Sequence, residues 1–168
     1  MKQLSHSETP TYPRTFPIMV LCDEITLSAN IGVILRLADA FGVEKVVFGG
    51  EKVGISGRKV KYASRSTHLW VQHSQTPDLG AEISKLKLEG YEIIALEITD
   101  QSKPLHELRI RQKQKIAVVV GSEIQGISKG VLKLCNQAIH IPIYGRNTSM
   151  NVSNALAVIL YKITNKLT

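Results

Sequence analysis

The sequence has only two cysteines, Cys22 and Cys135, and they lie far apart among 168 residues. They form no C-x-x-C pair and no Cys/His spacing typical of a zinc site, and the histidines lack paired spacing as well. We therefore expect no metal site and no disulfide scaffold. Both thiols are predicted to be reduced and to lie in the core of a cytoplasmic protein.

Long hydrophobic runs are also missing, since no apolar stretch reaches the length that a bilayer span requires. The opening residues, MKQLSHSETPTYPRTFP, contain no apolar segment of the kind found in signal peptides, so we expect no membrane partner. Residues 1–16 are polar and contain Pro10 and Pro13, which predicts a flexible arm. Residues 17–168 show no repeat or linker and are predicted to form a single domain.

Acidic residues are in the minority, with 14 Asp and Glu against 21 Lys and Arg, a net charge of +7. This balance favours a polyanionic partner, with nucleic acid ahead of an anionic membrane surface, although many soluble proteins are mildly basic. One basic segment, residues 58–65, contains Tyr62 and is followed by Trp70, which favours contact with RNA or DNA phosphates. Its basic residues are Arg58, Lys59, Lys61 and Arg65.

A second basic segment, residues 109–115, has a basic residue at every second position. In an extended chain this spacing places all four on one side. A solvated connecting segment explains it equally well.

Short runs of Val, Ile and Leu alternate with segments of helical spacing. The runs predict strands at 18–25, 44–50, 91–99, 115–123 and 138–143. The helical spacings predict helices at 28–42, 76–90, 126–136 and from about residue 151, with a basic loop at 51–67 and a short helix or turn at 103–108. Because the strands are continuous apolar runs, we expect an α/β fold with a mainly parallel sheet and helices on both faces.

Ligands of such sheets bind beyond the carboxyl ends of the strands, and polar residues gather at these ends here. The first group is Asn30 and Gly32 at a predicted helix start, with Arg36 one to two turns later. A guanidinium at this place could hold a phosphate or carboxylate. A surface arginine paired with Asp39 is the alternative.

The second group is the segment GSEIQGIS, residues 121–128, between a predicted strand and helix. Gly121 and Gly126 would let the backbone approach a ligand. The segment is neither a G-x-G-x-x-G fingerprint nor a phosphate-binding loop with its lysine. A plain turn is an equal alternative.

The third group lies in IPIYGRNTSMNVSNA, residues 141–155, before the last predicted helix. A single residue is enough to cap a helix, and this segment has six with a side-chain oxygen. They are Asn147, Thr148, Ser149, Asn151, Ser153 and Asn154. The surplus indicates a small polar pocket rather than a cap alone.

Taken in order, the three groups resemble the motifs of the SpoU/TrmH-type RNA 2′-O-ribose methyltransferases, of the SPOUT or α/β-knot class. The motif N-x-G-x-x-x-R resembles Asn30, Gly32 and Arg36, and G-x-E-x-x-G after a strand resembles Gly121, Glu123 and Gly126. The third motif is similar to Ile141, Pro142, Gly145 and residues 149–153. The resemblance runs from about residue 18 to 166, and Ile143, Met150 and Asn154 depart from the usual residue types.

The resemblance implies a deep trefoil knot near the C-terminus that binds S-adenosyl-L-methionine in a bent form. Cofactor contacts are implied at Leu96, Gly121, Ile141 and Met150, with Ser149 and Asn151 nearby. The implied reaction transfers a methyl group to a ribose 2′-hydroxyl of structured RNA. The RNA is a tRNA or an rRNA, with a slight preference for tRNA.

The catalytic group implied by the resemblance comprises Asn30, Arg36, Glu123, Ser149 and Asn151. The family assigns the role of base to the arginine that matches Arg36, although a guanidinium stays protonated. We therefore expect Arg36 to hold the neighbouring phosphate and to stabilise the developing alkoxide. Glu123, Ser149 and Asn151 would orient the ribose, Arg36 or the cofactor.

The last predicted helix is apolar on nearly all sides from Ala155 to Tyr161. Such a helix needs a cover on more than one face, so we expect the sheet on one side and a second subunit on the other. The family resemblance also implies a homodimer. Two other classes stay open, an RNA-binding protein of the same fold without catalysis and a Rossmann-type nucleotide-binding domain.

Overall fold

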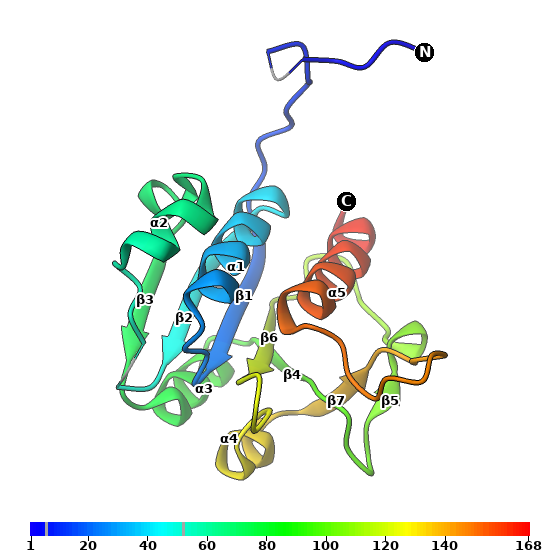
Figure 1. The fold of residues 1–168 in the computed structure, drawn as a ribbon. Coiled ribbons are helices and arrows are strands. Elements are labelled where there is room, and N and C mark those ends of the chain that lie inside the picture. The colour runs from blue at the N-terminus through cyan, green and yellow to red at the C-terminus, as the bar shows by residue number, and fades with distance from the viewer. Residues whose placement is uncertain (6, 52) are drawn as a thin grey trace.

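The computed structural model describes residues 1–5, 7–51 and 53–168. Within this part of the chain a parallel sheet has the strand order β3-β2-β1-β6-β4-β7-β5, which confirms the mainly parallel sheet predicted above (Figure 1). The strands are β1 (Phe16–Asp23), β2 (Val43–Gly49), β3 (His73–Thr76), β4 (Glu92–Leu96), β5 (Lys103–Pro104), β6 (Ile116–Gly121) and β7 (Gln137–His140).

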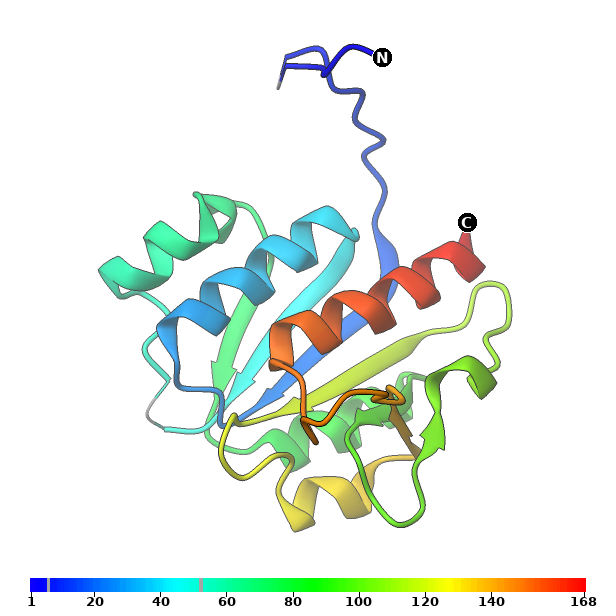
Figure 2. The ribbon, with the colours of Figure 1, turned by 45° about the vertical axis from the view of Figure 1, so that its right-hand side comes forward.

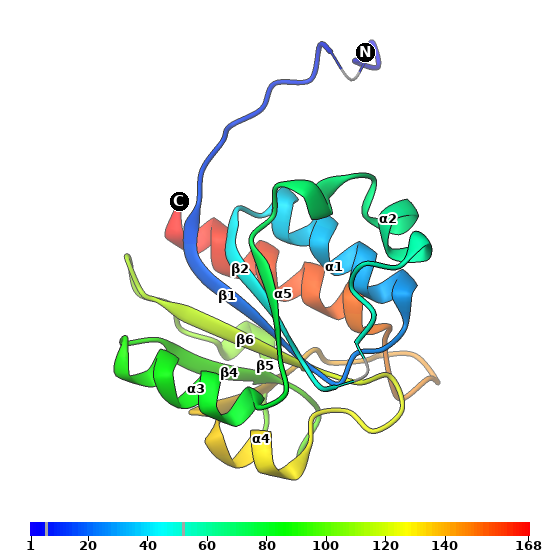
Figure 3. The same ribbon diagram turned by 90° about the vertical axis from the view of Figure 1, so that its left-hand side faces the viewer.

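Helices cover both faces of the sheet (Figure 3). One face carries α1 (Ser28–Ala40), α2 (Arg58–Ser64) and α5 (Val152–Leu167), and the other carries α3 (Leu79–Leu88) and α4 (Lys129–Leu134). Two short 3₁₀ helices, η1 (Thr67–Leu69) and η2 (Leu105–Glu107), lie in the connections. Among the helices that the structure describes, none combines the length and the apolar character needed to traverse a bilayer.

Two hydrophobic cores explain why the strands are continuous apolar runs. Ile18, Val20 and Cys22 of β1 belong to the core under α1 and α5, whereas Met19 and Leu21 belong to the core under α3 and α4. Successive strand residues point to opposite faces, so a strand covered on both sides must be apolar at every position.

Helix α2 lies in the segment that we predicted as a basic loop, so that prediction is wrong for residues 58–64. Only Val60 and Ser64 of this helix are buried, which leaves too little hydrophobic pattern to indicate a helix. The helix instead depends on its contact with α1. A Cβ atom on Gly32 would lie 2.4 Å from the Cβ atom of Ala63.

The sheet edges also differ from the prediction. Strand β3 was not predicted because its sequence, HSQT, is polar and its pairing with β2 is made by the backbone. Strand β7 ends at His140 rather than at residue 143. The predicted turn at 103–108 begins with the two-residue strand β5 and continues as η2.

Strand β7 lies between β4 and β5, although β4 and β5 follow one another in the sequence. The connection at 97–102 therefore passes across the carboxyl end of β7. The chain leaving β7 continues to α5 on the opposite side of the sheet from α4, and Figure 2 shows this orange segment beside the green connection. The order of the strands thus brings loops from distant parts of the sequence close together at the carboxyl ends of β4 and β7.

The N-terminal arm contains no helix or strand in residues 1–5 and 7–15, and it extends away from the body of the molecule (Figure 1). Strand β1 begins at Phe16, the last residue assigned to the arm from the sequence. The final helix begins at Val152, as predicted, with Asn151 as its N-cap.

Candidate functional site

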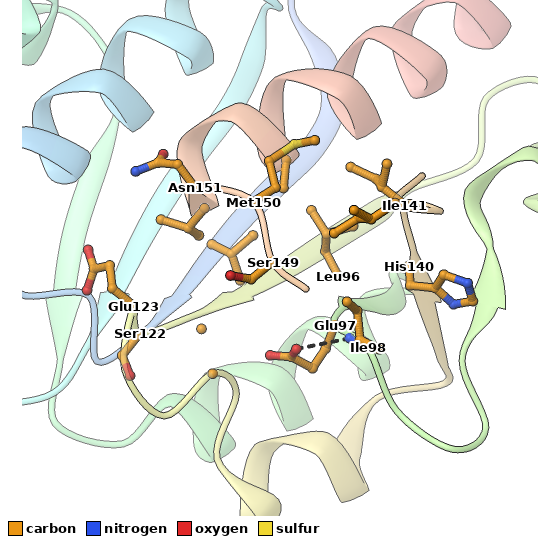
Figure 4. A pocket seen from close by; sticks show the side chains of 16 residues that line it. Leu96, Glu97, Ile98, Ser122, Glu123, His140, Ile141, Ser149, Met150 and Asn151 are labelled. Atoms are coloured by element: carbon orange, nitrogen blue, oxygen red, sulfur yellow. Dashed lines mark hydrogen bonds between the residues drawn. The ribbon is translucent and has the colours of Figure 1, made fainter. Parts of the chain in front are cut away.

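A cavity of about 420 Å³ lies where the segments after β4, β6 and β7 meet. Figure 4 shows the side chains that surround it. Its lining residues are Leu96, Glu97, Ile98, Val120, Gly121, Ser122, Glu123, Gly126, His140, Ile141, Ile143, Ser149, Met150, Asn151, Val152 and Ala155. In a parallel sheet the carboxyl ends of all strands lie along the same edge, and ligands of α/β proteins bind beyond this edge.

Every residue for which the sequence implied a cofactor contact lines this one cavity. Leu96 ends β4, Gly121 ends β6 and Ile141 directly follows β7. The segment before α5 supplies Ser149, Met150 and Asn151. These residues line the part of the cavity next to that helix (Figure 4). The structure therefore brings together residues from two of the three sequence motifs around a shared space.

Asn30 connects the first motif to the other two. Its side-chain amide donates to Glu123 Oε1 at 2.5 Å, and its carbonyl Oδ1 accepts from the Asn151 Nδ2 group at 3.2 Å. Asn151 Oδ1 in turn accepts from the backbone N–H of Ser153, which caps α5. Asn151 therefore has two roles, because it caps the helix through one group and holds Asn30 through the other.

The turn after β6 depends on its two glycines. A Cβ atom on Gly121 would lie 2.1 Å from the carbonyl carbon of Gly126, and Gly126 has a φ of +66°. Two hydrogen bonds, between Ser122 and Gly126 in each direction, close the turn. The glycines let the turn fold tightly against the cavity, since any side chain at Gly121 would collide with the backbone on the other side of the turn.

The cavity is acidic, in contrast to the net charge of +7 of the whole chain. Two carboxylates, those of Glu97 and Glu123, line it, and His140 is the one residue with a basic side chain among the described lining residues. Such a site favours a ligand that carries positive charge over a phosphate-bearing anion.

The thiol of Cys22 lies in the core beneath this site. Burial raises the pKa of the Cys22 thiol, and the negative charges of Glu123 and Asp23 raise it further. Burial also raises the pKa of the half-buried Cys135 to about 11. Both cysteines are free thiols, and their raised pKa values keep them protonated at neutral pH.

A sequence model of the SpoU rRNA Methylase family matches residues 17–161. The chain belongs to the SpoU rRNA Methylase family. This match spans the sheet from the second residue of β1, the cavity and most of α5. The same family was indicated by the three sequence motifs.

Curated relatives agree with this membership. A tRNA (guanosine(18)-2′-O)-methyltransferase of Aquifex aeolicus is 27% identical over 161 residues, 96% of this chain and 75% of the relative. The enzyme of the same name from Escherichia coli K12 is 32% identical over 150 residues, 89% of this chain and 64% of the relative. The chain spans as little as 38% of another curated relative, from Synechocystis, which is 32% identical over 89% of this chain.

Solved structures of the SpoU family have the same fold. The A. aeolicus TrmH/SpoU tRNA modifying enzyme superposes with a TM-score of 0.80 at 27% identity, covering 91% of this chain and 76% of that one. The SpoU methyltransferase AviRb of Streptomyces viridochromogenes, solved in complex with AdoMet, gives 0.79 at 22% identity and covers 99% and 63%.

Arg36, the arginine of the first SpoU motif, does not line the cavity. It is an exposed residue of α1, six positions beyond Asn30. Six helical residues correspond to about 9 Å along the axis and about 240° around it. In the described part of the chain Arg36 forms no salt bridge, so the alternative pairing with Asp39 is wrong, and Asp39 accepts instead from Trp70 Nε1 at 2.8 Å.

The four basic residues predicted to contact RNA all lie on α2 or directly after it, and all are exposed. They are Arg58, Lys59, Lys61 and Arg65. Tyr62 and Trp70 are exposed beside them, at 87% and 56%. The structure therefore displays the charged and aromatic groups of this segment on a helix rather than on the loop that was predicted.

Several lining residues were not among the predicted site residues, and Glu97 is the most informative. It directly follows Leu96 at the carboxyl end of β4, so its place at a strand end was a signal that could have found it. His140 at the end of β7 carries the same signal. Among the described residues, no cluster of three or more His, Cys, Asp and Glu side chains could hold a metal ion.

Proposed function

We propose that this SpoU-family chain transfers a methyl group from S-adenosyl-L-methionine to a ribose 2′-hydroxyl of RNA, with tRNA favoured over rRNA. One observation carries the proposal. The residues for which the motifs imply cofactor contacts line a single cavity. Asn30 of the remaining motif is hydrogen-bonded to Glu123 and Asn151, which line the same cavity. The names of the A. aeolicus and E. coli relatives support tRNA as the substrate class.

The charge of the cavity supports the choice of cofactor. S-adenosyl-L-methionine carries a sulfonium and no phosphate, which suits a site lined by Glu97 and Glu123. A dinucleotide would bring phosphates toward these carboxylates, which weakens the Rossmann-type alternative. AviRb, which has this fold, was solved with the same cofactor.

When bound, the cofactor would supply a methyl group, activated on its sulfonium, for transfer to the ribose 2′-oxygen. The 2′-hydroxyl would give up its proton to phosphate or water. Asn30 fixes the orientation of Glu123 and Asn151, so these side chains need not reorganise when the ribose binds. Ser149 lies beside them to contact the ribose or the cofactor (Figure 4).

We assign to Arg36 the role of a phosphate clamp. Its guanidinium stays protonated, so it offers paired donors to the phosphate next to the target ribose and stabilises the developing alkoxide. Its exposed position outside the cavity suits contact with RNA rather than with the cofactor. The basic residues Arg58, Lys59, Lys61 and Arg65 would bind further phosphates, with Tyr62 and Trp70 available to stack on bases.

We further propose the homodimer and the trefoil knot that the family resemblance implies. The dimer is supported by α5, which buries one face and leaves Val158 and Tyr161 exposed at 42% and 65%. The knot is supported by the position of β7 between β4 and β5, because the chain leaving β7 then has to cross the connection at 97–102.

Methyl transfer can be tested with purified protein, cofactor labelled in its methyl group, and separate tRNA and rRNA fractions. Mass spectrometry of the digested RNA should detect the label on a ribose, and the labelled fraction identifies the RNA class. Arg36→Ala should lower the rate by about a hundredfold or more. Arg36→Lys should restore little of it, because lysine cannot make the paired contact.

Label on a base, or no label in either fraction, would contradict the proposal. Absence of label together with tight RNA binding would favour the alternative of an RNA-binding protein without catalysis.

A further inference from the structure

Glu97 is the second carboxylate of the cavity. The sequence motifs give it no role, and the proposed function uses only its negative charge. Its side chain is held by two backbone groups from different segments. Glu97 Oε1 accepts from the N–H of Ile98 at 2.9 Å, and Oε2 accepts from the N–H of Ile127 at 3.1 Å. Its own N–H donates to the carbonyl of Ile139 at 3.0 Å. Both carboxylate oxygens, and the backbone N–H of the same residue, are therefore held in place by hydrogen bonds.

The position of Glu97 also depends on Gly126. A Cβ atom on Gly126 would lie 2.5 Å from Glu97 Oε2, so the side chain lies directly over the glycine turn. Figure 4 shows the carboxylate in the space between Ile98 and Ser122, on the side of the cavity away from Asn151. The two ends of the cavity thus each have one carboxylate, Glu123 beside the catalytic asparagines and Glu97 beside Leu96.

Glu97 has acceptor capacity left over. A carboxylate offers about four lone-pair sites, and two of them are used by the backbone. Each oxygen therefore keeps one acceptor site, and the residue lines the cavity. Two adjacent acceptors of this kind match two adjacent hydroxyl donors, in the way that an acidic side chain holds the ribose of a dinucleotide in other α/β proteins.

We propose that Glu97 binds the vicinal 2′- and 3′-hydroxyls of the adenosine ribose of the cofactor, and so determines the specificity of the cavity for a ribonucleoside. This inference rests on the proposed function, since it takes S-adenosyl-L-methionine as the ligand. The target nucleotide of the RNA is not the occupant, because an internal nucleotide has its 3′-oxygen esterified and presents no free pair of hydroxyls. Leu96, the neighbouring residue, is already expected to contact the cofactor.

The test measures affinities by isothermal titration with S-adenosyl-L-homocysteine and with its 2′-deoxy and 3′-deoxy derivatives. With the unchanged chain each deoxy derivative should bind about tenfold more weakly or worse, because a hydrogen bond to a charged acceptor is lost. With Glu97→Gln the parent ligand should weaken by about tenfold, while the deoxy derivatives weaken little further, so that the ratio between the ligands falls close to one.

Glu92→Gln is the matched control. Glu92 is a carboxylate at the other end of the same strand, where it accepts from the side-chain amides of Gln114 and Gln137 away from the cavity. This variant should keep the ligand ratio of the unchanged chain. If Glu97→Gln does not fold, Glu97→Asp serves instead, since it withdraws the carboxylate by one methylene and should also lower the ratio.

The inference is overturned if Glu97→Gln weakens all three ligands equally, which is the result of a purely structural brace. It is also overturned if the unchanged chain binds the deoxy derivatives as tightly as the parent. Failure of the unchanged chain to bind S-adenosyl-L-homocysteine at all would instead count against the proposed function.

Discussion

Asn30 shows how much of the site depends on a single uncharged side chain. The residue is 7% exposed, it lies in the first turn of α1, and its amide joins Glu123 from the turn after β6 to Asn151 before α5. An amide can serve both partners at once because it is a donor on one side and an acceptor on the other. A carboxylate or an ammonium in the same place could satisfy only one of them.

Replacing Asn30 with alanine should therefore lower both stability and activity. The loss of two partly buried hydrogen bonds should reduce the free energy of unfolding by about 1–3 kcal/mol. Methyl transfer at saturating substrate should fall by about tenfold or more, because Glu123 and Asn151 lose their fixed orientation. Chemical denaturation and a methyl-transfer assay measure the two effects. Asn154→Ala, at an exposed position of α5, is the control. An unchanged rate in Asn30→Ala would contradict the orienting role.

At the scale of elements, the contact between α1 and α2 ties the proposed RNA surface to the site. Gly32 lies against Ala63 and Ser64, where an added Cβ atom would come within 2.4 Å of a side chain and 2.8 Å of a backbone nitrogen. The helix that carries Asn30 therefore also supports the basic residues of α2. The glycine of the first SpoU motif has a packing role here rather than a chemical one.

Gly32→Ala should separate the two helices and lower the free energy of unfolding by about 1–3 kcal/mol, as overpacking does in other cores. Gly130→Ala is a matched control on α4, since nothing lies within 4 Å of a Cβ atom at that position. It should be neutral or stabilising by up to about 1 kcal/mol, because alanine is the better helix former. Equal effects of the two substitutions in chemical denaturation would show that the contact between α1 and α2 does not constrain the fold.

The same contact explains which elements could be predicted. Helix α1 and strands β1, β2, β4 and β6 were recognised because their own residues carry the hydrophobic pattern. Helix α2 was not, because its Ala63 packs against Gly32 of α1, which lies 31 residues earlier in the chain. Most of the candidate site followed from the strand ends and the motifs. Glu97 also follows a strand end, but the backbone N–H groups of Ile98 and Ile127 that hold its carboxylate could not be read from the sequence.

For the whole molecule, the exposed face of α5 supports the proposed homodimer. Val158 and Tyr161 lie one turn apart on that face, while Leu156, Ile159 and Ile163 pack into the core. A contiguous apolar patch on a protein surface marks an interaction site, and these two side chains are neighbours on the exposed face. We assign this face to a second copy of the chain.

Tyr161→Glu should therefore convert a dimer into a monomer by placing a charge in the interface. Light scattering at micromolar concentration measures the mass, and circular dichroism checks that the fold is kept. Asn165→Asp, at an exposed position one turn further along α5, should leave the dimer intact if the interface centres on the apolar pair. An unchanged chain that is monomeric at this concentration would contradict the assignment.

The placement of β7 between β4 and β5 has a consequence for biosynthesis. Residues 149–151, which form one wall of the cavity, are translated after the strands of the sheet, and with the proposed knot they would reach their place only once the chain has passed the connection at 97–102. A partly synthesised chain can form much of the sheet but has no complete binding site. Ligand binding therefore reports on the final step of folding, and a ligand that binds the cavity should slow the opening of the C-terminal segment more than that of the sheet.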